Sequence, residues 1–138
     1  MIAKVIAYIT RERVGETQLL VFEHVDQPDA GVQVPKGTME QGESPVDAAR
    51  REVREETGLT QVDGLKHIGK IIQTEFGEPE EWNFFAMALD GDAPDSWVHF
   101  VGGKGEDKGM RFRFYWLTLP PYIKLAGNQG DGLWMLKS

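Results

Sequence analysis

The chain has 138 residues, of which 41% are hydrophobic, and this length fits one domain, residues 1–138, with a substantial core. It contains no cysteine, which excludes disulfides and thiolate metal sites, so any metal ion must be held by oxygen or imidazole ligands. The formal net charge of -7 argues against a broad basic face for nucleic acid, so we expect no nucleic-acid partner.

The first part of the chain is predicted to form strands. Residues 4–10 and 18–23 are typical of strands and are joined by a polar turn over residues 11–17. A short apolar stretch, residues 32–34, leads into a Pro-Lys-Gly turn at residues 35–37. The start of the chain lacks the features of a signal peptide, and no run approaches the roughly 18 apolar residues of a membrane span. We therefore expect a cytoplasmic protein without a membrane partner.

The clearest helix is predicted between Ser44 and Gly58. Ser44 is a good N-cap residue, Pro45 suits the first helical position, and Gly58 is a natural C-terminal stop. A buried stripe follows helical spacing and is formed by Val46, Ala49 and Val53.

The remainder of the chain is predicted to add strands and a short helix. The strands are residues 65–72, 82–89, 97–101 and 111–118. An acidic loop with Glu75, Glu78, Glu80 and Glu81 separates the first two, and a glycine-rich loop at residues 102–109 separates the last two. Residues 120–136 contain a short helix. Several strands with one or two helices predict an α/β fold, in which a mixed sheet is covered on its faces.

Three glutamates in the predicted helix, Glu52, Glu55 and Glu56, stand at i, i+3 and i+4. They project from one face over an arc of about 100°, next to the buried stripe. Like charges at this spacing cost roughly 0.2–0.5 kcal/mol per pair, and a hard cation such as Mg²⁺ would offset that cost. Taken alone, such a cluster is more often a solvated charged face with pairs such as Arg51 with Glu55.

The surrounding residues favour the functional interpretation. A complete pattern resembles the Nudix box, and it consists of Gly37, Glu43, Arg51, Glu52, Val53, Glu55, Glu56, Gly58 and Leu59. The resemblance implies an α/β/α sandwich with a mixed sheet, in which the box forms a loop, a helix and a loop. It also implies a hydrolase that uses Mg²⁺, with Mn²⁺ as the alternative ion.

The resemblance further implies roles for the box residues. The expected metal ligands are the carboxylates of Glu52, Glu55 and Glu56 together with the backbone carbonyl of Lys36. Arg51 is expected to orient a glutamate of the metal site, and Glu43 to support the loop and helix. Gly37 lets the backbone turn tightly and approach a phosphate. The general base is either Glu55 or an acid outside the box.

The external candidates for the base are Glu106 and Asp107 in the glycine-rich loop, with residues 78–81 as a second source. A base-stacking surface is a hypothesis for four aromatic residues, Phe76, Trp82, Phe84 and Phe85, although strand aromatics more often belong to the core. Phosphate could be contacted by Lys36, Lys104, Lys108, Arg111 and Arg113, and alternation places both arginines on one sheet face. We assign no catalytic role to His24, His67 and His99.

The resemblance implies a pyrophosphohydrolase that cleaves a nucleoside diphosphate linked to another moiety. The sequence Val34-Pro35-Lys36-Gly37 resembles dinucleoside polyphosphate and diphosphoinositol polyphosphate hydrolases of the family, so these substrates and nucleoside triphosphates stay open. The acidic charge disfavours a capped RNA 5′ end. An alternative of another class is a non-catalytic domain that binds a nucleotide and regulates a partner. Many relatives form homodimers, but no feature of this sequence selects an oligomeric state.

Overall fold

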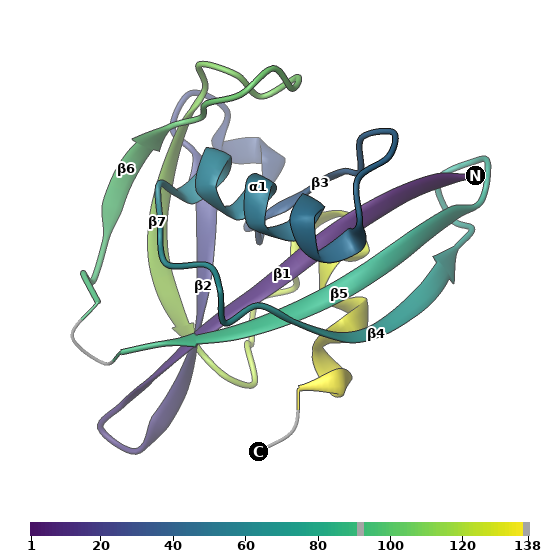
Figure 1. Cartoon of the computed structure of the whole chain (residues 1–138). Coiled ribbons are helices and arrows are strands. Elements are labelled where there is room, and N and C mark those ends of the chain that lie inside the picture. The colour runs from purple at the N-terminus through teal and green to yellow at the C-terminus, as the bar shows by residue number, and fades with distance from the viewer. Residues whose placement is uncertain (91–92, 137–138) are drawn as a thin grey trace.

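A computed structural model describes residues 1–90 and 93–136, and a strongly twisted mixed sheet lies at its centre (Figure 1). The strand order is β4-β5-β1-β2-β7-β6, and β3 pairs with β1. The strands are β1 (Ile2–Arg13), β2 (Glu16–His24), β3 (Lys36–Thr38), β4 (Lys66–Gln73), β5 (Glu80–Leu89), β6 (Trp97–Phe100) and β7 (Arg111–Thr118). The helices are η1 (Pro28–Ala30), α1 (Pro45–Thr57) and η2 (Ala126–Met135). The sheet is mixed because β1 runs parallel to β5 and antiparallel to β2 and β3.

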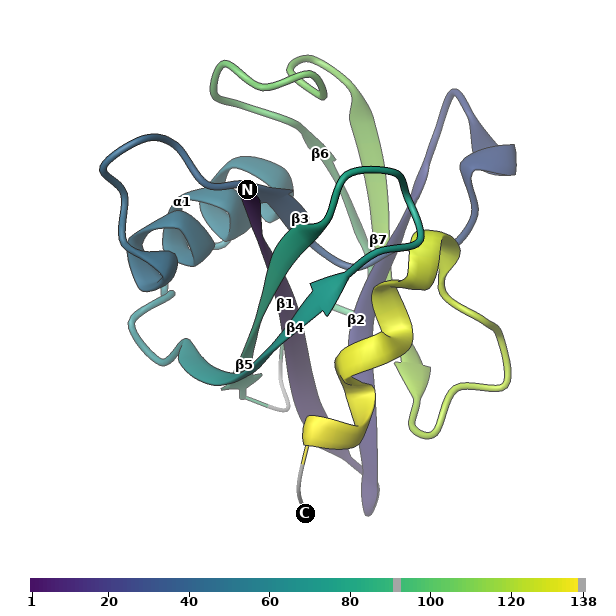
Figure 2. The ribbon, with the colours of Figure 1, turned by 90° about the vertical axis from the view of Figure 1, so that its right-hand side faces the viewer.

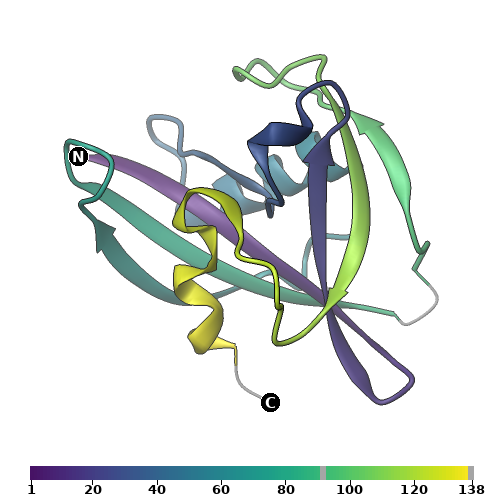
Figure 3. The ribbon, with the colours of Figure 1, turned by 180° about the vertical axis from the view of Figure 1, so that it is seen from behind.

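Alternation along the central strand divides the core into two layers. Val5, Ala7 and Ile9 of β1 face α1, whereas Ile6 and Tyr8 face the opposite side. Figure 2 shows the sheet between α1 and η2, and the view from behind places η2 across the face of β1 (Figure 3). The expected α/β/α sandwich with a mixed sheet is therefore confirmed. None of the helices in the described ranges has the length and apolar character needed to cross a bilayer.

Helix α1 forms as its sequence predicts. The side chain of Ser44 accepts a hydrogen bond from the backbone amide of Asp47 at 3.2 Å, and Pro45 occupies the first turn. Gly58 ends the helix in the left-handed region, with φ of 80°. Ala49 and Val53 are buried against the sheet. The glutamates next to them therefore lie at the border between helix and sheet.

The predicted strands are confirmed, but three predicted loops are shorter than expected. Strand β1 continues to Arg13 because residues 11–13 pair with residues 16–18 of β2, so the predicted turn at residues 11–17 shrinks to Val14 and Gly15. The predicted turn at residues 35–37 was wrong in part, since Lys36 already pairs with β1 as part of β3. Likewise Glu80 and Glu81 belong to β5 and not to the acidic loop. Pairing with a neighbouring strand extends each segment beyond its local signal.

The C-terminal segment is held on the second face of the sheet by a buried hydroxyl. The Tyr8 hydroxyl donates to the carbonyl of Gln129 at 2.6 Å and accepts from the amide of Gly132 at 3.0 Å. The side chain of Gln129 in turn accepts from the amide of Val34 at 2.8 Å. The helix expected within residues 120–136 is thus confirmed as η2, which is interrupted by positive φ at Gly127 and Asn128.

Replacement of Tyr8 by Phe tests this anchor. The Tyr8→Phe variant should lose about 1–3 kcal/mol of unfolding free energy, because a buried carbonyl and a buried amide lose their partner. Tyr122→Phe is the matched control, since Tyr122 is 92% exposed. Urea unfolding followed by tryptophan fluorescence measures both variants. Equal stability of the two would contradict an anchoring role for the Tyr8 hydroxyl.

Candidate active site

A cleft of about 520 Å³ opens beside the glutamate face of α1. Its walls come from β1, β3, α1, the loop after β6 and the side chain of Gln129. Glu52, Glu55 and Glu56 all line it, as do Lys36 and Gly37. The cleft therefore brings together the helix and the loop of the box, which the sequence predicted to act as one unit.

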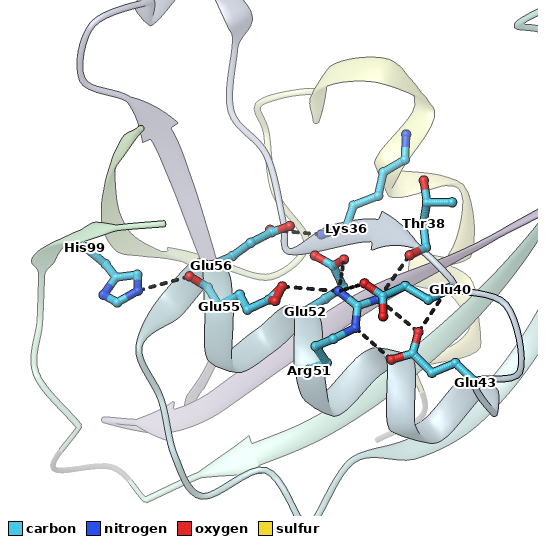
Figure 4. Close-up of polar contacts among 9 residues, drawn as sticks. All are labelled: Lys36, Thr38, Glu40, Glu43, Arg51, Glu52, Glu55, Glu56 and His99. Carbon is cyan, nitrogen blue, oxygen red and sulfur yellow. Dashed lines mark hydrogen bonds and ion pairs between the residues drawn. The ribbon is translucent and has the colours of Figure 1, made fainter. Parts of the chain in front are cut away.

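Glu56 is the most buried ionisable group in this cleft, with an exposed fraction of 4%. The backbone amide of Lys36 in β3 donates to its Oε1 at 3.2 Å (Figure 4). Burial raises the pKa of Glu56 well above the usual value, and the neighbouring Glu52 raises it further. Within the described ranges, Glu56 forms no ion pair with a Lys, Arg or His side chain. This carboxylate is thus placed where a positive charge would stabilise its ionised form.

Two glycines allow the backbone to lie directly against the other glutamates. A side chain at Gly37 would overlap the carboxylate of Glu52, and one at Gly103 would overlap the carboxylate of Glu55. Gly37 belongs to β3, whereas Gly103 belongs to the loop after β6. The glutamate face of α1 is therefore approached closely by the backbone of two separate segments.

Arg51 organises the acidic side chains around it (Figure 4). Its Nε and Nη2 donate to the two carboxylate oxygens of Glu43 at 2.7 and 3.0 Å. Its Nη1 donates to Glu52 at 2.8 Å and to Glu55 at 3.2 Å, which confirms the predicted contact at i, i+4. Arg51 lowers the pKa of Glu43, and these acids raise the pKa of Arg51. The bidentate contact ties the loop before α1 to the middle of the helix.

The three glutamates line one cleft, and their role as joint metal ligands stays a prediction. No three His, Asp or Glu side chains of the described residues surround a common point as metal ligands would. Arg51 contacts Glu52 and Glu55, while Glu56 accepts from the amide of Lys36 and lies beside Glu52. The residues still fit a hard divalent cation, since buried Glu56 stands beside Glu52 without a cationic partner in the described part of the chain.

Strand β6 holds the C-terminal end of α1, a role that sequence reasoning missed. The Nε1 of Trp97 donates to the carbonyl of Thr57 at 2.9 Å, and the Nε2 of His99 lies 3.0 Å from the carbonyl of Glu55. The amide of Gly102 donates to the same carbonyl at 3.0 Å. These groups satisfy carbonyls that a helix end leaves unpaired. The sequence predicts that residues of β6 alternate between two faces, but it does not show that Trp97 and His99 contact α1.

The remaining predicted residues fall into separate places. Glu106 and Asp107 line the cleft, as does Lys104, so the external base candidates do reach the site. Arg111 and Arg113 share a sheet face as predicted, but they pair with Asp26 and Glu23. Arg111 is not among the described residues that line the cleft.

The proposed aromatic surface is corrected by burial. Trp82, Phe84 and Phe85 are fully buried, so their rings offer no open face to a base. Their side chains pack in the two core layers, as strand aromatics commonly do. Phe76 alone of the four is exposed, at 53%, and its ring stacks on Trp82 with a centroid distance of 6.0 Å.

Comparison with known proteins places the chain in a family. The NUDIX domain family model matches residues 2–118. A protein of Bartonella bacilliformis named RNA pyrophosphohydrolase is 32% identical over 101 residues, which cover 63% of this chain and 57% of that protein. A protein of the same name from Bartonella clarridgeiae is 45% identical over 49 residues, covering 36% of this chain and 27% of that protein. The chain thus spans less than two thirds of the length of these relatives.

Solved structures share the fold. The NUDIX domain of Shewanella oneidensis NrtR in complex with ADP ribose has a TM-score of 0.71 at 11% identity, covering 96% of this chain and 84% of that one. A binary complex of the C. elegans Ap4A hydrolase has a TM-score of 0.69 at 20% identity, covering 98% and 94%. Because the family match extends over residues 2–118 and the complete box lies on β3 and α1, this chain belongs to the Nudix hydrolase family.

Proposed function

We propose that this protein is a pyrophosphohydrolase that depends on a divalent metal ion and cleaves a phosphoanhydride bond in a small nucleotide-like substrate. The observation that carries the proposal is the buried Glu56 beside Glu52, at the wall of a cleft into which the box residues project. A cation held by these carboxylates would reconcile an acidic site with an acidic substrate. Mg²⁺ is the expected ion, with Mn²⁺ as the alternative.

The residues that would hold the ion are Glu52 and Glu56, with Glu55 and the backbone carbonyl of Lys36 as further ligands. When bound, the ion neutralises charge on the phosphates and makes a water molecule easier to deprotonate. Gly37 keeps the wall of the cleft open beside Glu52, because any larger residue would fill the space of that carboxylate. Arg51 holds Glu52 and Glu55 in place through Nη1.

Glu55 is the general base that the geometry favours. Its carboxylate lies between Arg51 and the backbone of Gly103 and lines the cleft. Burial, and then the charge of Glu52, raises the pKa of Glu55, which brings this acid closer to the pH at which a base operates. Glu106 and Asp107 line the same cleft and are the alternative base.

The substrate is a nucleoside diphosphate linked to another moiety, or a chain of more phosphates as in a dinucleoside polyphosphate or nucleoside triphosphate. The names of the relatives support cleavage of phosphoanhydrides, since they include RNA pyrophosphohydrolases and an Ap4A hydrolase. The complete box disfavours a purely regulatory nucleotide-binding domain, which would bind its ligand without turnover.

A substrate panel with Glu56→Gln tests the proposal. Wild-type protein should release phosphate or nucleotide from at least one member only when Mg²⁺ or Mn²⁺ is present, and Glu56→Gln should lower kcat by roughly 100-fold or more. Glu16→Gln is the control, because Glu16 is exposed in the β1–β2 hairpin away from the cleft. Binding of nucleotides without turnover of any substrate would instead favour the regulatory class.

Single substitutions at saturating Mg²⁺ identify the base. Glu55→Gln should lower kcat by about 100-fold or more, whereas Glu106→Ala and Asp107→Ala should each retain near-normal turnover. Initial rates against the preferred substrate measure the three effects. Near-normal kcat in Glu55→Gln with a large loss in Glu106→Ala or Asp107→Ala would move the base to the loop after β6.

Thermal stability tests the charge balance at Glu56. Folding raises the pKa of Glu56 above its ordinary value of 4.5, so the folded state holds this proton more tightly than the unfolded state does. The protonated carboxyl therefore stabilises the fold at low pH, and this contribution is lost as the pH rises above 4.5. A divalent ion favours the ionised carboxylate, so the increase in Tm caused by Mg²⁺ should grow with pH over the same interval. Differential scanning fluorimetry measures this increase. In Glu56→Gln both trends should flatten, and a Mg²⁺ effect equal to that of wild type would contradict Glu56 as a ligand.

A further inference from the structure

The cleft extends beyond the glutamates to a second wall that carries two lysines. Lys4 of β1 and Lys36 of β3 both line it. In the antiparallel pairing Lys4 lies opposite Thr38, and Ile6 lies opposite Lys36, so both lysines project from the η2 side of the sheet. Such diagonal neighbours are about 7–8 Å apart, within reach of long side chains. Figure 4 shows the side chain of Lys36 leading away from Glu56, although its amide contacts that carboxylate.

The ammonium group of Lys36 lies over an aromatic ring and not beside a carboxylate. It lies 4.4 Å from the centroid of the Trp82 ring and forms no ion pair within the described ranges. The side chain of Lys36 is half-buried. Lys4 itself has only a distant carboxylate, the Oε2 of Glu80 at 3.8 Å. The contact of Lys4 with Glu80 is thus the one ion pair that these two neighbouring cations form in the described part of the chain.

Holding the ammonium groups of Lys4 and Lys36 close together is electrostatically unfavourable, and a bound anion would stabilise both. The attraction of a cation to an aromatic face offsets only part of the loss of hydration on burial. If Lys36 served only to stabilise the fold, a carboxylate partner would do so better. Lys70 has such a partner, because its Nζ lies 3.2 Å from Oε1 of Glu81. A phosphate between the two ammonium groups would instead be bound by both, since lysine acts as a point charge toward phosphate.

We propose that Lys4 and Lys36 form a phosphate subsite separate from the glutamates, so that the preferred substrate carries three or more phosphates in a chain. The inference rests on the proposed function, in which the cleaved anhydride lies beside Glu52 and Glu56. A substrate with only two phosphates places both of them at the glutamates. A further phosphate in the same chain extends along the cleft to the lysine wall, where the opposite charge receives it.

Selectivity between two substrates tests the subsite. Diadenosine tetraphosphate and ADP ribose are compared at saturating Mg²⁺ for wild type, Lys4→Gln and Lys36→Gln. In each variant the ratio of kcat/KM for the tetraphosphate to kcat/KM for ADP ribose should fall by about 10-fold or more, mainly through KM. Lys36→Arg should recover most of the ratio, because it keeps a cation over Trp82. Lys70→Gln is the control and should leave the ratio unchanged.

A binding measurement keeps this inference separate from the proposed function. Calorimetry of metal-free protein with inorganic tripolyphosphate should show a Kd that rises about 10-fold or more in Lys4→Gln and in Lys36→Gln, but not in Lys70→Gln. If wild type turns over neither substrate while this binding still depends on the two lysines, the subsite stands and the proposed function fails. If turnover is normal but the ratio and the tripolyphosphate Kd do not respond to either lysine, the subsite is overturned.

Discussion

The burial of Glu56 next to Glu52 is the interaction on which the rest of the site depends. Removing a carboxylate from water beside a second carboxylate is costly, and the raised pKa of Glu56 expresses that cost. The hydrogen bond from the amide of Lys36 offsets part of this cost. That amide lies beside Glu56 because β3 pairs with β1. The remainder is left for a cation, which is why a metal-dependent reaction is the function that the site supports best.

Around this buried carboxylate, helix α1 is fixed at several points. Arg51 ties it to Glu43 at its N-terminal loop, and the donors of Trp97 and His99 hold its last turn. Close approaches at Gly37 and Gly103 prevent the glutamates from moving into the surrounding backbone. Because these contacts come from β3, β6 and two loops, the position of the acidic face is determined by the whole sheet and not by the helix alone.

The cleft carries its three box glutamates and the pair Lys4 and Lys36 on different walls. The three glutamates lie on α1 beside Arg51, whereas Lys4 and Lys36 stand on β1 and β3. The loop after β6 adds Glu106, Asp107 and Lys104. In a protein with a net charge of -7, this local separation gives an elongated anion two different kinds of contact. One is mediated by a cation at the glutamates, and the other is direct at the lysines. The proposals for metal, base and phosphate subsite all follow from this division.

The sequence alone determined the features that depend on local spacing. The cap at Ser44, the stop at Gly58, the face shared by the three glutamates and the contact of Arg51 with Glu55 each involve neighbours within one helix, so helical geometry sufficed to predict them. The strands that cross the core were predicted for the same reason, since their apolar pattern is carried by each segment.

Only the tertiary structure decided which distant segments meet. It placed Lys36 in β3, buried the ring of Trp82 and brought His99 to the end of α1. It also set Glu52 and Glu55 against Arg51, with Glu56 buried beside Glu52. No spacing in the chain encodes these contacts, because they arise from pairing and packing between segments far apart in sequence. The sequence therefore predicts where a carboxylate lies on its helix, but it does not predict which residue of another segment contacts that carboxylate.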